Sequence, residues 1–185
     1  MARLIFLGAP GAGKGTQAAI LSKQKGMPHI STGEILRNAV SQQTNLGAKA
    51  QAYMDRGELV PDLLLYDLVR ERLQEPDAIN HGWILDGFPR TVPQAEFLDA
   101  LVVEMNQPYQ SVVNIAVPDE VLLQRLLLRG RKDDTEEVIR NRLRVYYEQT
   151  APLVNYYQQL NRLVEVDGNQ TEVEVMQQLL RLITD

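Results

Sequence analysis

The sequence predicts an α/β fold: a five-stranded parallel sheet with helices on both faces. Five short apolar segments recur along the chain, and a longer stretch with helical spacing follows each of them. Strands that alternate with helices form parallel sheets, because a helix carries the chain back to the start of the next strand. Polar and glycine-rich residues follow three of these segments, at the edge where parallel sheets bind ligands.

The expected strands are short runs of apolar residues. They cover residues 3–7, 28–30, 83–85, 112–117 and 163–166. A glycine-rich loop follows the first strand, Ser31-Thr32-Gly33 follows the second, and Asp86-Gly87 follows the third. These three segments are therefore the first candidates for a binding site.

The helices are predicted from their first residues and their apolar spacing. Thr32 and Thr135 are residue types that cap helices, and Pro61 is a typical start. Amphipathic spacing continues for several turns after each of these positions. Helices are expected over residues 16–24, 32–40, 61–73, 135–160 and 171–183.

Composition limits what the protein can be. With 185 residues, 44% of them hydrophobic, the chain can bury roughly 70% of its unfolded surface, which suits a single domain covering residues 1–185. A formal net charge of −5 argues against nucleic acid or an anionic membrane as the main partner. Cysteine is absent, which rules out disulfides and thiolate zinc sites. No apolar run reaches about 18 residues, so a cytoplasmic protein, with a monomer as the simplest state, is expected.

A glycine-rich loop over residues 8–16 directly follows the first strand. Gly8, Gly13 and Lys14 match the Gly-x-x-x-x-Gly-Lys spacing of phosphate-binding loops, in which backbone N–H groups and a helix N-terminus hold phosphate oxygens. This favours a P-loop NTPase-type fold over the competing interpretation, a flexible turn. Because Gly15 follows the lysine and the hydroxyl comes one place later, the pattern argues against direct magnesium ligation by that hydroxyl.

Four motifs together resemble one known family. They are Gly8–Thr16, Ser31–Glu34, Gly57–Asp62 and Asp86–Thr91. In this order they closely resemble the adenylate kinase family of nucleoside monophosphate kinases, over essentially the whole chain. The resemblance implies reversible transfer of the γ-phosphoryl group of ATP, bound with Mg²⁺, to AMP, which gives two ADP.

The resemblance also implies roles for particular residues. ATP is expected at Gly11, Ala12, Gly13, Lys14, Gly15, Thr16, Arg125, Arg129 and Gly168. AMP is expected at Thr32, Arg37, Glu58, Leu59, Val60, Gly87, Phe88, Pro89, Arg90, Gln94, Arg131 and Arg142. The residues expected to be catalytic are Lys14, Arg90, Arg125, Arg129, Arg131 and Arg142.

The chemistry of phosphoryl transfer fits this set. The reaction needs positioning and charge neutralisation more than a protein nucleophile, and each guanidinium can hold phosphate oxygens with two donors. For any single arginine, and for Arg125 above all, a solvated helix face is the alternative. Asp86 is expected to hold magnesium through water, with a turn-forming role before Gly87 as its alternative. The pair Asp133-Asp134 resembles lid-closing residues but is equally typical of a solvated loop, and is left out of the catalytic set.

Two segments are expected to close over the nucleotides. Residues 31–60 are more polar and helical than a simple crossover needs, which predicts a flap that binds the monophosphate. Many relatives insert a large lid, some with zinc-binding cysteines. Here residues 129–137 leave room only for a short lid loop, and no zinc is expected. The loop from Arg129 to Asp134 is expected to order on ligand binding and to exclude water.

Other functions remain open at this stage. Thr32 and Gln94 offer a hydroxyl and an amide that match the edge of adenine, whereas UMP/CMP kinases, the closest competitors, usually differ at both positions. A switch protein that reads guanine would carry an Asn-Lys-x-Asp stretch, and the sequence has none. A non-catalytic nucleotide-binding module would be expected to have lost Lys14 or some of the arginines, and all are in place.

Overall fold

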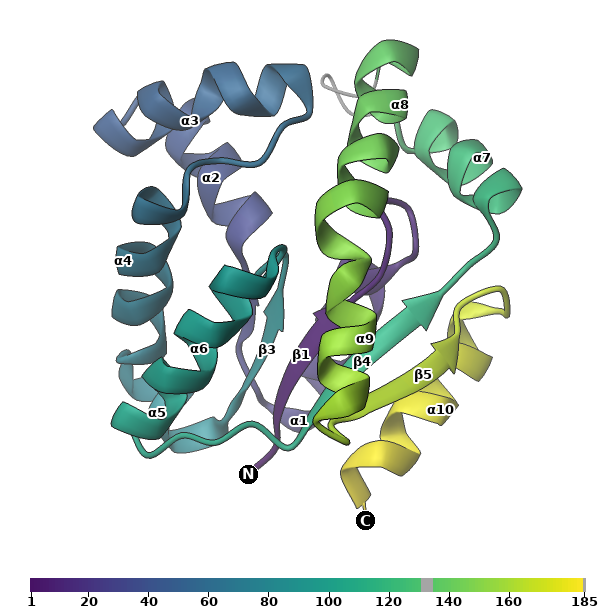
Figure 1. Ribbon diagram of the computed structural model, residues 1–185. Coiled ribbons are helices and arrows are strands. Elements are labelled where there is room, and N and C mark those ends of the chain that lie inside the picture. The colour runs from purple at the N-terminus through teal and green to yellow at the C-terminus, as the bar shows by residue number, and fades with distance from the viewer. Residues whose placement is uncertain (131–134, 185) are drawn as a thin grey trace.

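The computed structural model describes residues 1–130 and 135–184 of the chain. Its centre is a five-stranded sheet of order β2-β3-β1-β4-β5, in which all neighbouring pairs are parallel. The strands are β1 (Arg3–Leu7), β2 (His29–Ser31), β3 (Trp83–Asp86), β4 (Ser111–Ala116) and β5 (Leu163–Asp167). Helices lie on both sides of this sheet (Figure 1). The predicted α/β class with five parallel strands is therefore confirmed.

The helices follow the strands in the order expected of such a sheet. They are α1 (Lys14–Lys25), α2 (Thr32–Ser41), α3 (Asn45–Arg56), α4 (Asp62–Leu73), α5 (Pro76–His81), α6 (Val92–Glu104), α7 (Asp119–Arg129), α8 (Glu136–Val145), α9 (Pro152–Gln159) and α10 (Glu172–Thr184). In the two described ranges, no helix is long and apolar enough to cross a membrane.

Every strand lies within one residue of its predicted position. The shift in β2 has a clear cause, because Pro28 has no N–H to donate to the ladder. Its carbonyl oxygen still accepts from Ile84 N at 3.0 Å, and the strand begins at His29 instead.

The sheet is buried on both faces because successive side chains of β1 enter two separate cores. Leu4 and Phe6 pack with residues of α1 and α10. Ile5 and Leu7 pack on the other face with residues of α4, α6 and α9. Burial on both faces explains the uninterrupted apolar runs that predicted the strands.

The helices α2 and α3 form a separate pair beyond the carboxyl end of β2 (Figure 1). They approach closely at Gly47, where a Cβ would lie 2.2 Å from the carbonyl oxygen of Ala39. The predicted cap of α2 at Thr32 is wrong by one residue. Ser31, which is still extended, accepts from Glu34 N at 3.4 Å, so the helix already includes Thr32. The pair lies within the segment expected to form a flap.

The helix predicted over residues 135–160 is not one regular helix. Thr135 caps α8 as expected, but a π-helical turn, Tyr146–Thr150, separates α8 from α9. Pro152 is at the start of α9 and has no N–H for an intrahelical bond. Just before Pro152 the helix has the wider turn of a π-helix, in which Ala151 N donates to Tyr146 O, five residues earlier, at 2.8 Å.

Gly47→Ala is expected to push α2 and α3 apart, because the new Cβ would overlap the Ala39 carbonyl. Overpacking of this kind costs about 1–3 kcal/mol, which urea unfolding can measure. Gln51→Ala, at an exposed position of the same helix, is the control and is expected within about 0.5 kcal/mol of the wild type. Equal stability of the two variants would contradict the close helix contact.

Candidate active site

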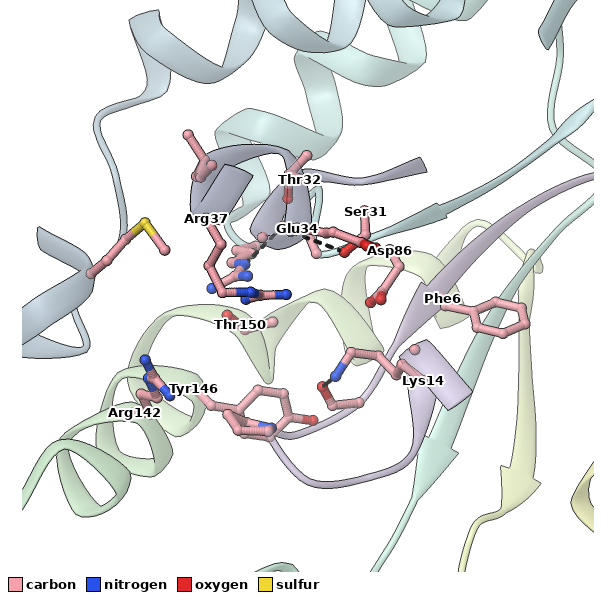
Figure 2. A pocket seen from close by; sticks show the side chains of 18 of the residues that line it. Phe6, Lys14, Ser31, Thr32, Glu34, Arg37, Asp86, Arg142, Tyr146 and Thr150 are labelled. Carbon is pink, nitrogen blue, oxygen red and sulfur yellow. Dashed lines mark hydrogen bonds between the residues drawn. The ribbon is translucent and has the colours of Figure 1, made fainter. Parts of the chain in front are cut away.

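A large cavity opens where β1, β2 and β3 end, at the carboxyl edge of the sheet. Its volume is about 890 Å³, within the range of small-molecule sites. The walls come from the glycine-rich loop, α2, residues 57–60, residues 86, 87, 89 and 90, and from α7 and α8. Figure 2 shows side chains from several of these elements around the cavity. The segments that the sequence singled out for binding therefore meet in one place.

The glycine-rich loop follows a backbone course that glycine permits. Gly8, next to the end of β1, has a φ of 139°, and a Cβ there would lie 2.6 Å from the carbonyl oxygen of Ile115. Gly13, with a φ of 95°, immediately precedes α1, and a Cβ there would meet no atom within 4 Å. The first N–H groups of α1 therefore lie beside open space that an anion can enter.

Lys14 folds back onto this loop. Its Nζ donates to the carbonyl oxygens of Gly8 at 2.6 Å and Ala9 at 3.0 Å. Burial, opposed by the charge of Asp86 and assisted by Arg90 and a further arginine, lowers the pKa of Lys14 to about 8. A phosphate in the cavity would favour the charged ammonium and raise this pKa again.

Arginines reach the cavity from opposite sides. Arg37 belongs to α2 and Arg142 to α8, with the cavity between them (Figure 2). Arg90 is held by its own loop, because its Nε donates to Gly87 O at 2.7 Å. Burial lowers the pKa of Arg90, while the charge of Asp86 raises it and the other two arginines lower it.

Positive charge exceeds negative charge along the described walls of this cavity. The acids there are Glu34, Glu58 and Asp86, and the cations are Lys14, Arg37, Arg90, Arg125, Arg129 and Arg142. The whole chain has the opposite balance, a net charge of −5. A local excess of arginine and lysine in an acidic protein is suited to a polyanion such as a nucleotide phosphate.

Asp86 ends β3 and is 7% exposed. Its Oδ2 lies 3.4 Å from Nε2 of His29. Burial works against ionisation, but this hydrogen bond and the charge of Lys14 hold the pKa of Asp86 below its usual value. A Cβ on Gly15 would lie 3.7 Å from the same oxygen, so the carboxylate faces the first turn of α1.

This geometry fits magnesium bound through water. Magnesium usually takes one or two carboxylates together with phosphate oxygens and water, and Asp86 supplies an ionised carboxylate beside the phosphate loop. Within the described residues, no group of three side chains of the metal-binding types is gathered. Asp86 could therefore hold a magnesium ion through water, with phosphate oxygens and solvent as the other ligands.

The main cavity contains most of the residues predicted to bind AMP. Those that line it are Thr32, Arg37, Glu58, Leu59, Val60, Gly87, Pro89, Arg90 and Arg142. Phe88 and Gln94 are fully buried and are not among the lining residues. Gln94 Oε1 accepts from Arg90 N at 2.7 Å, and its Nε2 donates to Asp62 Oδ1 at 2.6 Å. The structure thus places Gln94 behind the wall of the cavity.

A smaller cavity of about 270 Å³ adjoins the first through Arg125, which lines both. The other predicted residues that line it are Ala12, Thr16 and Gly168. The Arg125 guanidinium donates to Gly168 O at 3.1 Å. A ligand whose phosphates occupy the main cavity would have room here for a ring system beside this guanidinium.

Comparisons with known proteins agree with this geometry. The adenylate kinase family profile matches residues 6–162. The chain belongs to the adenylate kinase family. It is 58% identical over 179 residues to adenylate kinase 1 of Nostoc sp., covering 97% of each chain. It is 56% identical over 180 residues to adenylate kinase 1 of Synechocystis sp., covering 97% of this chain and 96% of the relative. The adenylate kinase of Nocardia farcinica is 50% identical over 181 residues, covering 98% of each.

Adenylate kinases are nucleoside monophosphate kinases, so this family member is a phosphotransferase enzyme with adenylate kinase activity. The family assignment predicted from the four motifs is confirmed. Of the predicted site residues, Gly11, Gly13, Lys14, Gly15 and Arg129 also line the main cavity. Arg131, like Asp133 and Asp134, lies outside the described residues. The individual roles of these residues remain predictions.

The cavity of this adenylate kinase also contains residues that the motifs did not reveal. Tyr146 and Thr150 follow Arg142 at intervals of four residues and line the same cavity, and this spacing was visible in the sequence. His29, for which the sequence motifs predict no role, lines the cavity as the partner of Asp86. Residues 31–60, the segment expected to form a flap, contribute Leu36, Asn38, Ser41 and Met54.

The lowered pKa of Lys14 predicts a pH dependence of folding. Between the folded value of about 8 and the ordinary value of 10.5, the unfolded chain binds more protons than the folded chain. This group therefore makes the free energy of unfolding rise with pH across that window. Urea unfolding at pH values between about 7 and 10 is expected to show a smaller rise in Lys14→Met. The same slope in both proteins would contradict the shifted pKa.

Proposed function

We propose that the protein transfers the γ-phosphoryl group reversibly from MgATP to AMP, with the phosphates of both nucleotides in the main cavity. The observation that carries this proposal is the placement of Lys14, Arg90 and Arg142 around one cavity with excess positive charge. Phosphoryl transfer is accelerated by charges that are fixed in place before the reaction. The family profile supports the same pair of substrates.

On the donor side, the ATP phosphates would lie over residues 11–16, at the N-terminus of α1. Lys14 would exchange its two loop carbonyls for phosphate oxygens, and backbone N–H groups would hold the remaining oxygens. Arg129 would contact ATP phosphate as well. Arg125 would lie against the adenine, whose ring would occupy the smaller cavity beside Gly168.

On the acceptor side, AMP would enter beneath α2 and α3. Arg37 and Arg90 would hold its phosphate, each with two parallel donors. Arg142, together with Arg131, would reach the transferring phosphoryl group from the opposite side. Thr32, the backbone of residues 58–60 and the loop 87–90 would line the adenosine, with Gln94 close behind.

Magnesium would arrive with ATP and be held through water by Asp86. The bound ion supplies positive charge that neutralises the phosphates during transfer. Asp86 keeps its carboxylate ionised for this task, and the contact with His29 Nε2 at 3.4 Å fixes its orientation. The absence of cysteine supports an enzyme without structural zinc.

Exclusion of water would depend on two segments of the single domain. We assign residues 31–60 as the flap over AMP. Residues 129–137 remain the expected short lid over ATP, and residues 131–134 of that segment lie outside the described part of the chain. Closure of both would keep water from acting as the acceptor, which would otherwise hydrolyse ATP. The acidic, cysteine-free composition supports a cytoplasmic protein that acts on nucleotides rather than on nucleic acid or membranes, and a monomer is its simplest state.

A coupled assay of ADP formation from MgATP and AMP, GMP, CMP or UMP tests the proposal. AMP is expected to be the preferred acceptor. Lys14→Met is expected to lower kcat by about 10³, because it removes a charge next to the transferring group. Lys23→Met, which changes an exposed lysine of the same helix, is the matched control and is expected to keep wild-type turnover.

Each other result of this assay has a definite meaning. Preference for UMP or CMP would make the protein a pyrimidine monophosphate kinase. Binding of ATP without turnover of any monophosphate would make it a non-catalytic module. A loss below about tenfold in Lys14→Met would contradict the role of that lysine.

Gln94→Ala is expected to raise the KM for AMP more than the KM for MgATP, because the amide lies beside the acceptor end of the cavity. Steady-state kinetics, with each substrate varied in turn, separate the two constants. Gln159→Ala, at an exposed position of α9, is expected to change neither. Equal rises in both constants would remove Gln94 from the acceptor pocket.

A further inference from the structure

Asp62 is the first residue of α4 and has no part in the proposed reaction. Its Oδ1 accepts from Gln94 Nε2 at 2.6 Å, and its Oδ2 lies 3.5 Å from the hydroxyl of Tyr66. Gln94 itself is fully buried. Because a carboxylate accepts and does not donate, the nitrogen of the Gln94 amide is the end that faces Asp62.

The other end of the same amide is fixed as well. Gln94 Oε1 accepts from the backbone N–H of Arg90 at 2.7 Å. Turning the amide over would set its oxygen against the Asp62 carboxylate and its NH₂ group against the Arg90 N–H. Both hydrogen bonds would be lost in a buried place, where unpaired polar groups are costly. One N–H and one oxygen lone pair of the amide take part in neither contact. Because the amide cannot turn over, the positions of this remaining donor and acceptor are fixed.

That order suits one class of purine. Adenine donates from its 6-amino group and accepts at N1, so the oxygen and the N–H of a carboxamide can pair with both. A 6-oxopurine carries an acceptor at C6 and a donor at N1, which is the reverse order. It would meet oxygen with oxygen and N–H with N–H unless the amide turned over. A polar mismatch inside a buried site discriminates strongly between substrates.

We propose that Asp62 is a positioning residue that sets acceptor-base selectivity, because it holds the Gln94 amide in the orientation that pairs with 6-aminopurine monophosphates and opposes 6-oxopurine monophosphates. The inference rests on the proposed function, in which the acceptor base lies next to Gln94. Because Gln94 is buried and does not line the cavity, this pairing requires lining side chains to move aside when the base binds, a rearrangement that is common on ligand binding.

AMP and IMP test this directly, because their bases differ only at this edge. The value of kcat/KM is measured for both acceptors in the wild type, Asp62→Asn, Asp62→Glu and Asp55→Asn. An asparagine at position 62 can accept from the Gln94 amide or donate to a turned one, so only the Arg90 N–H would still oppose turning. The ratio of AMP to IMP is therefore expected to fall at least about tenfold. The KM for MgATP is expected to stay unchanged.

The other two variants separate positioning from charge. Asp62→Glu keeps a carboxylate acceptor and is expected to retain the preference for AMP. Asp55→Asn removes the same charge from an exposed position of α3 and is expected to retain it fully. Because the ratio compares two acceptors on one enzyme preparation, a partly unfolded fraction cancels out.

An unchanged ratio in Asp62→Asn would overturn the positioning role and leave the proposed function intact. So would a fall in the ratio accompanied by an equal rise in the KM for MgATP, which would indicate a general structural defect. A wild-type protein that phosphorylates neither AMP nor any other monophosphate would instead overturn the proposed function, and the inference with it.

Discussion

The structure depends on holding several positively charged side chains, among them Lys14 and Arg90, close together and largely shielded from solvent. Burial lowers the pKa of Lys14 and of Arg90, and Asp86 is the acid whose charge opposes both shifts. The described contacts that anchor these two cations are largely neutral: Lys14 donates to two loop carbonyls, and Arg90 donates to Gly87 O. A carbonyl can be exchanged for a phosphate oxygen without breaking an ion pair. Phosphate binding would then relieve the repulsion that the fold maintains.

The parallel sheet makes this arrangement feasible. Its parallel strands place the glycine-rich loop, the start of α2 and Asp86 at one edge, while α8 brings Arg142 from a distant part of the sequence. Both faces of the sheet are packed with apolar side chains. Rigid strands can therefore hold the charged groups in fixed positions relative to one another.

Much of the fold and of the phosphate site was predictable, for physical reasons. A sheet buried on both faces needs continuous apolar runs, so each strand could be placed within one residue. The Gly-Lys spacing identified the loop because few other backbones approach an anion so closely. By contrast, either Ser31 or Thr32 could have capped α2, and the sequence does not show where the extended backbone ends. The burial of Gln94 depends on Asp62, a partner 32 residues away, and no local pattern records such a contact.

The π-helical turn between α8 and α9 has a consequence for how this part of the chain can vary. A π turn holds one residue more than an α-helical turn, so it shifts the helical phase by about 100°. Arg142 before the turn can thereby face the cavity, while Leu153 and Tyr157 after it face the core. Deleting a single residue from the turn would rotate α9 relative to α8 by about 100°. Arg142 could then no longer face the cavity while Leu153 and Tyr157 face the core. The number of residues in the turn Tyr146–Thr150 is therefore more tightly constrained than the residue types within it.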